Sequence, residues 1–301
     1  MPQPRYSVFE IQPEWVLESE ALGSKVKFWY RAKDGEPEWL FKFPQPNTGQ
    51  HWSEKIAAEV AASLRTLHAQ VQLAVFQGVR GSATESFARH GRSLFHGNQI
   101  LAGQVLGYDP VKAFRQSDHT LTNIFTAIDK TFLTPASAHK AKTIFAGYLV
   151  LDALVGNTDR HHENWGILIK QVGDDWERIL APTFDHASSL GRELVDTAEG
   201  ICRERLLREG RVGAYAEKAH GAIFWEKSDM RGLSPLELVR RAAAIHPELF
   251  KPPLNRLERL DQQRLLAIID PVPDGWMTPV AREFALALMC YNYEELRKIR
   301  L

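Results

Sequence analysis

The sequence has few cysteines, no excess of charge of either sign, and no long hydrophobic run. Its two cysteines, Cys202 and Cys290, are too few for a disulfide framework and have no metal-type spacing, as is typical of a reduced cytosolic protein. Lys+Arg and Asp+Glu both total 37, so nothing global attracts the chain to DNA or to anionic lipid. The best apolar run, residues 143–155, contains Asp152 and is shorter than the roughly 18 apolar residues of a membrane span. With no apolar signal-peptide stretch in "MPQPRYSVFE", we expect a soluble cytoplasmic protein without direct DNA or membrane binding.

The sequence does contain a β-rich first third and a mostly helical remainder. "KVKFWYRAK" and "EWLFKFPQ" flank the turn-forming "GEP" and predict a hairpin, and "VQLAVFQ" and "SATESFAR" predict a second strand pair. "HWSEKIAAEVAASLRTL" has apolar residues at helical spacing, and a last helix is expected from Pro279. Beyond about residue 105 the strand signal fades. We expect a two-lobed α+β fold, with a small lobe over residues 1–104 and a larger helical lobe over residues 105–301.

The most unusual segment is "GNTDRHHENWG", residues 156–166, which follows the apolar run "TIFAGYLVLDALV". Asp159 in this turn could accept a proton from an attacking hydroxyl. Asn164 could offer an amide oxygen to Mg²⁺ without adding charge. Asp185, further on in "APTFDHASS", could bridge Mg²⁺ and phosphates. Protein kinases use this arrangement of a loop aspartate, an asparagine and a downstream aspartate to transfer a phosphoryl group from Mg·ATP.

The β-rich lobe should supply the groups that hold the nucleotide. Gly23 and Ser24 stand just before a strand, where backbone N–H groups could cover phosphates. Lys42 lies in the apolar strand "WLFKFP" and could pair with nucleotide phosphates and with a glutamate of the following helix. That helix offers Glu54 and Glu59, and we take Glu54 as the partner.

Together, "NTDRHHENWG" and "LAPTFDHAS" resemble the catalytic and metal loops of HipA-like serine/threonine kinases, which have a phosphatidylinositol-kinase-like fold. The family pattern Asn-x-Asp-x-His-x-x-Asn matches this chain, and the resemblance runs from about residue 20 to the C-terminal helix. It implies that Asp159 is the catalytic base, that Asn157 and His161 shape its loop, and that Asn164 and Asp185 bind Mg²⁺. The chain is most similar to the short, stand-alone members of the family.

The resemblance also implies where the adenine and the phosphates of ATP bind. "TESFARHGRSLFHGNQIL" resembles the adenine-hinge strand of the family, so Glu85, Ser86 and Phe87 are expected to form the hinge. Family members modify serines in the phosphate loop, which makes Ser24 a candidate self-phosphorylation site, although it could be an ordinary turn serine. A phosphate there would disfavour ATP binding by charge repulsion.

Simpler interpretations of these residues stay open. Asp159 could merely cap a helix, and Lys42 could be an edge-strand lysine that reaches water. His161, His162 and His186 could form a zinc site together with Asp159. However, adjacent histidines rarely point at one ion, and the chain has no H-E-x-x-H or H-x-x-E-H motif.

Two further segments carry weaker signals. "CRERLLREGR" favours a solvated helix face, or alternatively a docking surface for an acidic substrate or tRNA, through Arg203, Arg205, Arg208 and Arg211. "ASSLGREL" after the expected metal aspartate could be an activation segment, with Ser188 and Ser189 as candidate phosphorylation sites.

We therefore expect an ATP- and Mg²⁺-dependent serine/threonine kinase of the HipA-like type. The resemblance implies a toxin of a toxin–antitoxin pair that phosphorylates itself and a translation-related protein, such as an aminoacyl-tRNA synthetase, with an antitoxin as a further partner. A kinase of a small molecule or lipid headgroup and a catalytically silent nucleotide-binding module stay open as alternatives. The intact set of Asp159, Asn164 and Asp185 argues against the silent module.

Overall fold

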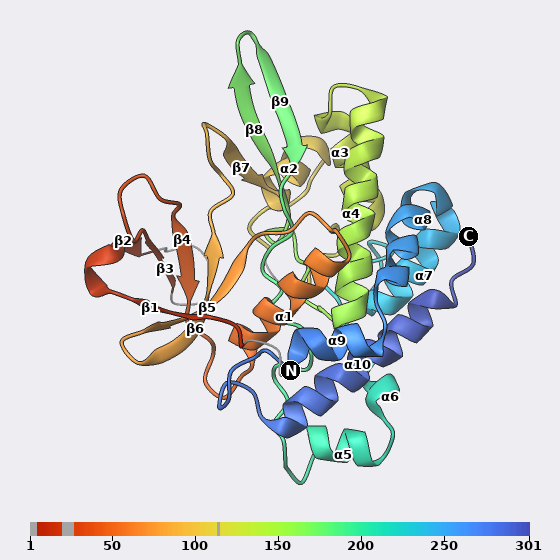
Figure 1. Ribbon diagram of the computed structural model, residues 1–301. Helices are drawn as coiled ribbons and strands as arrows, with labels where there is room; N and C mark the ends of the chain where they lie inside the picture. Colours follow the sequence, from red (N-terminus) through yellow and green to blue (C-terminus); the bar gives the residue numbers. More distant parts are fainter. Residues whose placement is uncertain (1–4, 20–26, 113–114) are drawn as a thin grey trace.

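The structure, a computed structural model, describes residues 5–19, 27–112 and 115–301. These residues form a small lobe around a β-sheet and a larger, mostly helical lobe (Figure 1). The expected two-lobed α+β fold is confirmed. No helix in these three ranges has the length and hydrophobicity that crossing a bilayer would require.

Six strands of the described chain form the main sheet, in the order β1-β5-β6-β4-β3-β2. Their bounds are β1 (Val8–Ile11), β2 (Val16–Ser19), β3 (Lys27–Tyr30), β4 (Trp39–Lys42), β5 (Val71–Phe76) and β6 (Val79–Glu85). The pairs β3–β4 and β5–β6 are antiparallel, so the predicted hairpin and the predicted second strand pair are both confirmed.

The register of β4 decides which way Lys42 faces. Phe41 is fully buried in a small aromatic cluster on one face of the sheet, with Phe28 and Phe76. Because neighbouring strand residues point to opposite faces, Lys42 faces the other side. It lies in one row with Ser82 of β6 and Leu73 of β5, and Leu73 packs in the large core with helix α1 (Gln50–Ser63). The lysine therefore points toward the side of the sheet that α1 covers.

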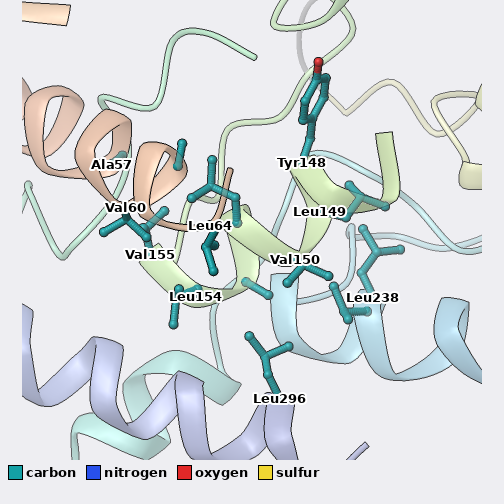
Figure 2. Close-up of a cluster of buried hydrophobic side chains, with 14 of the residues drawn as sticks. Ala57, Val60, Leu64, Tyr148, Leu149, Val150, Leu154, Val155, Leu238 and Leu296 are labelled. Carbon is teal, nitrogen blue, oxygen red and sulfur yellow. The ribbon is translucent and has the colours of Figure 1, made fainter. Parts of the chain in front are cut away.

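The larger lobe is built around one buried helix, α4 (Pro135–Val155). The helix begins at a Thr134–Ser137 capping box and ends at Gly156, which adopts the left-handed φ of 68° that favours glycine. Every residue from Phe145 to Val155 is buried. Figure 2 shows the apolar contacts of α4 with helices from both lobes through Val60, Leu64, Leu149, Val150, Leu154, Val155, Leu238 and Leu296. The apolar run before the polar cluster is thus the central buried helix of this lobe.

The other helices of the described chain pack against α4 directly or against a helix that does (Figure 1). They are α2 (Gly97–Gln104), α3 (Leu121–Thr131), α5 (Arg203–Arg208), α6 (Val212–Glu217), α7 (Pro235–Ile245), α8 (Pro247–Asn255), α9 (Gln262–Ile269) and α10 (Pro279–Arg297). Short 3₁₀ helices cover Pro13–Trp15 and Arg256–Arg259. The predicted helices after the first hairpin and at the C-terminus are both present, as α1 and α10.

The expectation that strands end near residue 105 is wrong. Three strands, β7 (Ser93–His96), β8 (Gly166–Val172) and β9 (Asp175–Leu180), form a second sheet in that order. The β8–β9 hairpin turns at Gly173, whose φ is 64°, and projects from the molecule (Figure 1). Its strands connect the polar cluster to the segment that carries Asp185. The lobe boundary at residue 104 stays a prediction.

Candidate active site

A buried ion pair anchors the polar loop that follows α4. Both carboxylate oxygens of Asp152 accept hydrogen bonds from Arg160, at 2.8 Å from Nε and 2.8 Å from Nη2. Asn157 Nδ2 donates to the same carboxylate at 2.8 Å. Arg160 Nη1 also donates to the carbonyls of Asn164 and Phe184, at 2.5 and 3.1 Å. Burial lowers the pKa of Arg160, but the charge and hydrogen bonds of Asp152, with the charges of Tyr148 and Glu54, together raise that pKa above its ordinary value. One arginine thus ties the loop to α4 and to the residue before Asp185.

The loop backbone closes around Asp159. Its N–H donates to Asn157 Oδ1 at 3.1 Å, and its carbonyl accepts from Asn164 Nδ2 at 2.6 Å and from the His161 N–H at 2.8 Å. The carboxylate Oδ2 accepts a hydrogen bond from Ser188 Oγ at 3.3 Å. Asn157 therefore shapes the turn, and the carboxylate of Asp159 stays partly exposed at the loop surface.

Lys42 and Asp185 form an ion pair that joins the two lobes. The Nζ–Oδ2 distance is 3.0 Å, and the lysine side chain is 11% exposed. Lys42 is therefore not a lysine that reaches water. Burial lowers its pKa, but the charges of Asp185, Glu54 and Asp159 together raise the pKa above its ordinary value, so the lysine is charged. Asp185 has a φ of 57°, a left-handed conformation that is strained for a residue with a side chain.

Glu54, the expected partner of Lys42, is fully buried on α1 and lies beside a histidine. Its Oε1 is 3.5 Å from His186 Nδ1, and His186 Nε2 pairs with Thr183 Oγ1 at 2.8 Å. Burial raises the pKa of Glu54, but the neighbouring His186 and the charge of Lys42 lower it overall. Lys42 thus makes its short contact with Asp185 and interacts with Glu54 through charge at longer range.

The residues around the Lys42–Asp185 ion pair fit Mg²⁺ and nucleotide phosphates. Asn164 uses its amide nitrogen on the carbonyl of Asp159, which leaves its amide oxygen as the group that a cation can use. Amide and carboxylate oxygens are the ligands that Mg²⁺ takes in proteins, so Asn164 and Asp185 are a suitable pair. Lys42 adds a buried positive charge of the kind that phosphates need. Gly23 and Ser24, the expected phosphate loop, lie outside the described residues.

The expected hinge residues lie at the end of β6. Glu85 pairs with the guanidinium of Arg89. The Ser86 N–H donates to the backbone carbonyl that precedes β4 at 2.8 Å, and its own carbonyl accepts from Arg89. Phe87 packs against Phe184, with ring centroids 5.3 Å apart. The structure thus brings Phe87 next to the residue before Asp185, while both backbone groups of Ser86 are hydrogen-bonded within the chain.

The three histidines considered for a zinc site have separate partners. His161 Nδ1 accepts a hydrogen bond from the Glu163 N–H at 3.2 Å, so its contact lies within the loop itself. His162 is buried, with Nδ1 2.7 Å from the hydroxyl of Tyr108, and His186 faces Glu54. Within the described ranges, no group of three or more His, Cys, Asp or Glu side chains could hold a metal ion.

Several buried or paired arginines have contacts that the sequence pattern did not predict. Arg203 was expected on a solvated face, but it is buried and donates to Asp196 Oδ1 at 2.8 Å and to the Gly191 carbonyl at 3.0 Å. Its neighbours Arg205 and Arg211 both form ion pairs with the exposed carboxylate of Glu209.

The sequence did contain a signal for the buried Asp152–Arg160 pair. Asp152 is a charged residue within an apolar run, and Arg160 follows shortly after that run.

Residues 15–231 match the model of the HipA-like C-terminal domain. The serine/threonine-protein kinase CtkA of Helicobacter pylori strain J99 is 24% identical over 293 residues, which cover 94% of this chain and 83% of CtkA. The crystal structure of the H. pylori proinflammatory kinase CtkA superposes with a TM-score of 0.74 and 21% identity, and covers 97% of both chains. HipA from the Shewanella oneidensis MR-1 toxin–antitoxin complex with HipB and operator DNA gives a TM-score of 0.54 at 16% identity, over 99% of this chain and 68% of HipA. Since the family model spans well over half of its length, this chain belongs to the HipA-like C-terminal domain family and has the fold of a HipA-like serine/threonine kinase.

Proposed function

We propose that the protein transfers the γ-phosphoryl group of ATP to serine or threonine hydroxyls, with Mg²⁺ as the metal. The observation that carries this proposal is the Lys42–Asp185 ion pair across the two lobes, next to the loop of Asp159. A buried lysine, a metal-type carboxylate and a partly exposed loop aspartate are the parts that phosphoryl transfer needs. In this proposal residues 1–104 form the nucleotide-covering lobe and residues 105–301 the catalytic lobe.

Each residue then has a distinct task. Lys42 would pair with the nucleotide phosphates, with Glu54 as its second carboxylate, while Asn164 and Asp185 would hold Mg²⁺. Asp159 orients the acceptor hydroxyl and takes its proton, and Asn157 and His161 keep the loop in shape. Glu85, Ser86 and Phe87 would border the adenine, and Gly23 and Ser24, which lie outside the described residues, would be the phosphate loop. ATP supplies the phosphoryl group, and the protein contributes mainly position and charge.

The acceptor is proposed to be a protein. CtkA is named a serine/threonine-protein kinase, and the HipA structure is that of a toxin–antitoxin system with HipB. By the same family relationship we propose a cytoplasmic location, a protein substrate, self-phosphorylation at Ser24, and an antitoxin as partner. A translation factor such as an aminoacyl-tRNA synthetase is the substrate that we would test first.

Phosphoryl transfer from radiolabelled ATP to the protein itself and to proteins of a cell extract tests the proposal. The Asp159→Asn variant should transfer no label, because the amide cannot accept the proton, while Mg·ATP binding in calorimetry and the circular dichroism spectrum stay close to wild type. Asp174→Asn, at the exposed β8–β9 turn, is the matched control and should be fully active. Equal labelling by the Asp159→Asn protein would reject the assignment of the base. Mapping label to Ser24 would test self-modification.

A further inference from the structure

We propose that Ser188, itself held by Arg192, is a positioning residue that fixes the carboxylate of Asp159 for proton acceptance. The inference rests on the proposed kinase function. Ser188 lies three residues after Asp185, in the segment that leaves the metal-binding part of the site. It is buried, and its hydroxyl donates to Asp159 Oδ2 at 3.3 Å.

Arg192 gives this hydrogen bond its direction. Its Nη2 donates to Ser188 Oγ at 3.2 Å. A serine hydroxyl has one hydrogen to donate and can accept through its lone pairs. Because Arg192 occupies a lone pair, the hydroxyl hydrogen is left for Asp159. The carboxylate needs such a partner, since the terminal torsion of an aspartate side chain has a broad energy profile and does not fix the plane of the oxygens by itself.

The backbone around Ser188 is fixed to both lobes. The Thr158 N–H donates to the Ser188 carbonyl at 3.3 Å, and the Leu190 N–H donates to the carbonyl at the end of α4 at 3.0 Å. On the other side, Ser53 Oγ of α1 donates to the Ser189 carbonyl at 2.9 Å. The N–H that precedes α1 donates to the Arg192 carbonyl at 2.8 Å. The Ser188 hydroxyl is therefore presented from a rigid segment, as a positioning group must be.

The same contact could instead block the site. If the Ser188 hydroxyl occupied the position of the acceptor hydroxyl, its removal would raise the rate. A positioning role predicts the opposite, because a carboxylate that rotates freely is less often aligned with the acceptor. The two interpretations therefore differ in the sign of the effect on kcat.

The decisive experiment compares Ser188→Ala and Ser188→Cys with Ser188→Thr in steady-state kinetics. We expect kcat to fall by about 10- to 100-fold in Ser188→Ala and Ser188→Cys, with the KM for ATP within about twofold of wild type. Ser188→Thr keeps the hydroxyl and should restore most of the rate. The cysteine variant has nearly the same size and a weak donor, which separates loss of the hydrogen bond from loss of packing. Ser189→Ala is the control, because the Ser189 hydroxyl has no hydrogen-bond partner within the described chain.

The outcomes separate the inference from the function on which it rests. An unchanged or raised kcat in both Ser188→Ala and Ser188→Cys overturns the positioning role while the kinase assignment stands. The positioning role is also overturned if a variant with wild-type thermal stability shows a fall in kcat together with an equally large rise in the KM for ATP. A wild-type protein that transfers no phosphoryl group to any acceptor overturns the proposed function itself, and the positioning role with it.

Discussion

Removing the carboxylate of Asp152, the residue of α4 that anchors the polar loop, should destabilise the protein strongly. The Asp152→Ala substitution leaves Arg160 charged, 3% exposed and without its counter-ion. Breaking a buried ion pair on one side costs about 3–5 kcal/mol, because the remaining charge keeps its desolvation cost and loses its partner. Asn157 Nδ2 loses its acceptor as well, an effect of about 1–3 kcal/mol that overlaps with the first. We expect the free energy of unfolding to fall by about 3–5 kcal/mol.

Urea denaturation followed by circular dichroism measures this loss, and a double variant distinguishes charge from shape. Asp152→Leu combined with Arg160→Met replaces the pair by apolar groups, which is often neutral or stabilising for a buried ion pair. The double variant should therefore regain much of the stability. It should not regain phosphoryl transfer, since the contacts of Arg160 with the Asn164 and Phe184 carbonyls are gone.

Asp174→Ala at the exposed β8–β9 turn is the control and should change stability by less than about 0.5 kcal/mol. A loss below about 1 kcal/mol in Asp152→Ala would contradict the account of a charge left uncompensated in the interior. Full activity in the double variant would show that the arginine does not position the loop.

Three further changes test other parts of the structure. Asp185→Ala should weaken Mg·ATP binding at least about tenfold in calorimetry, and an unchanged affinity would remove it from the metal site. Gly81→Ala should cost about 1–3 kcal/mol in urea denaturation, because a Cβ would lie 2.5 Å from the Lys42 carbonyl oxygen, whereas Gly103→Ala meets nothing within 4 Å and should be neutral or stabilising. Burial lowers the pKa of His119 to about 3, so the unfolded chain binds its proton first as the pH falls. Stability should then drop below about pH 6.5, by up to about 1.4 kcal/mol per pH unit, and a His119→Gln variant should show a shallower drop.

Local patterns in the sequence were enough for the elements of the fold that depend on near neighbours. The two hairpins of the first lobe, α1 and α10 follow from alternation, turn residues and helical spacing, and all four are present. The β8–β9 hairpin was missed, because "GILIKQV" is a short apolar run whose period does not distinguish a strand from a buried helix.

The sequence by itself determined the residue types of the candidate site, since the spacing of Asp159, Asn164 and Asp185 is a local property of two loops. Only the tertiary structure decided which of these residues meet Lys42. The pairing register of β4 turns Lys42 toward α1, where its short contact is with Asp185, while Glu54 faces His186. It also decided that Arg160 closes on Asp152 and that Ser188 reaches Asp159. The physical reason is that a shift of one residue in a strand, or a rotation of a packed helix by part of a turn, changes the direction in which a side chain points. Tertiary packing sets the register of the strand and the rotation of the helix, and spacing along the chain does not.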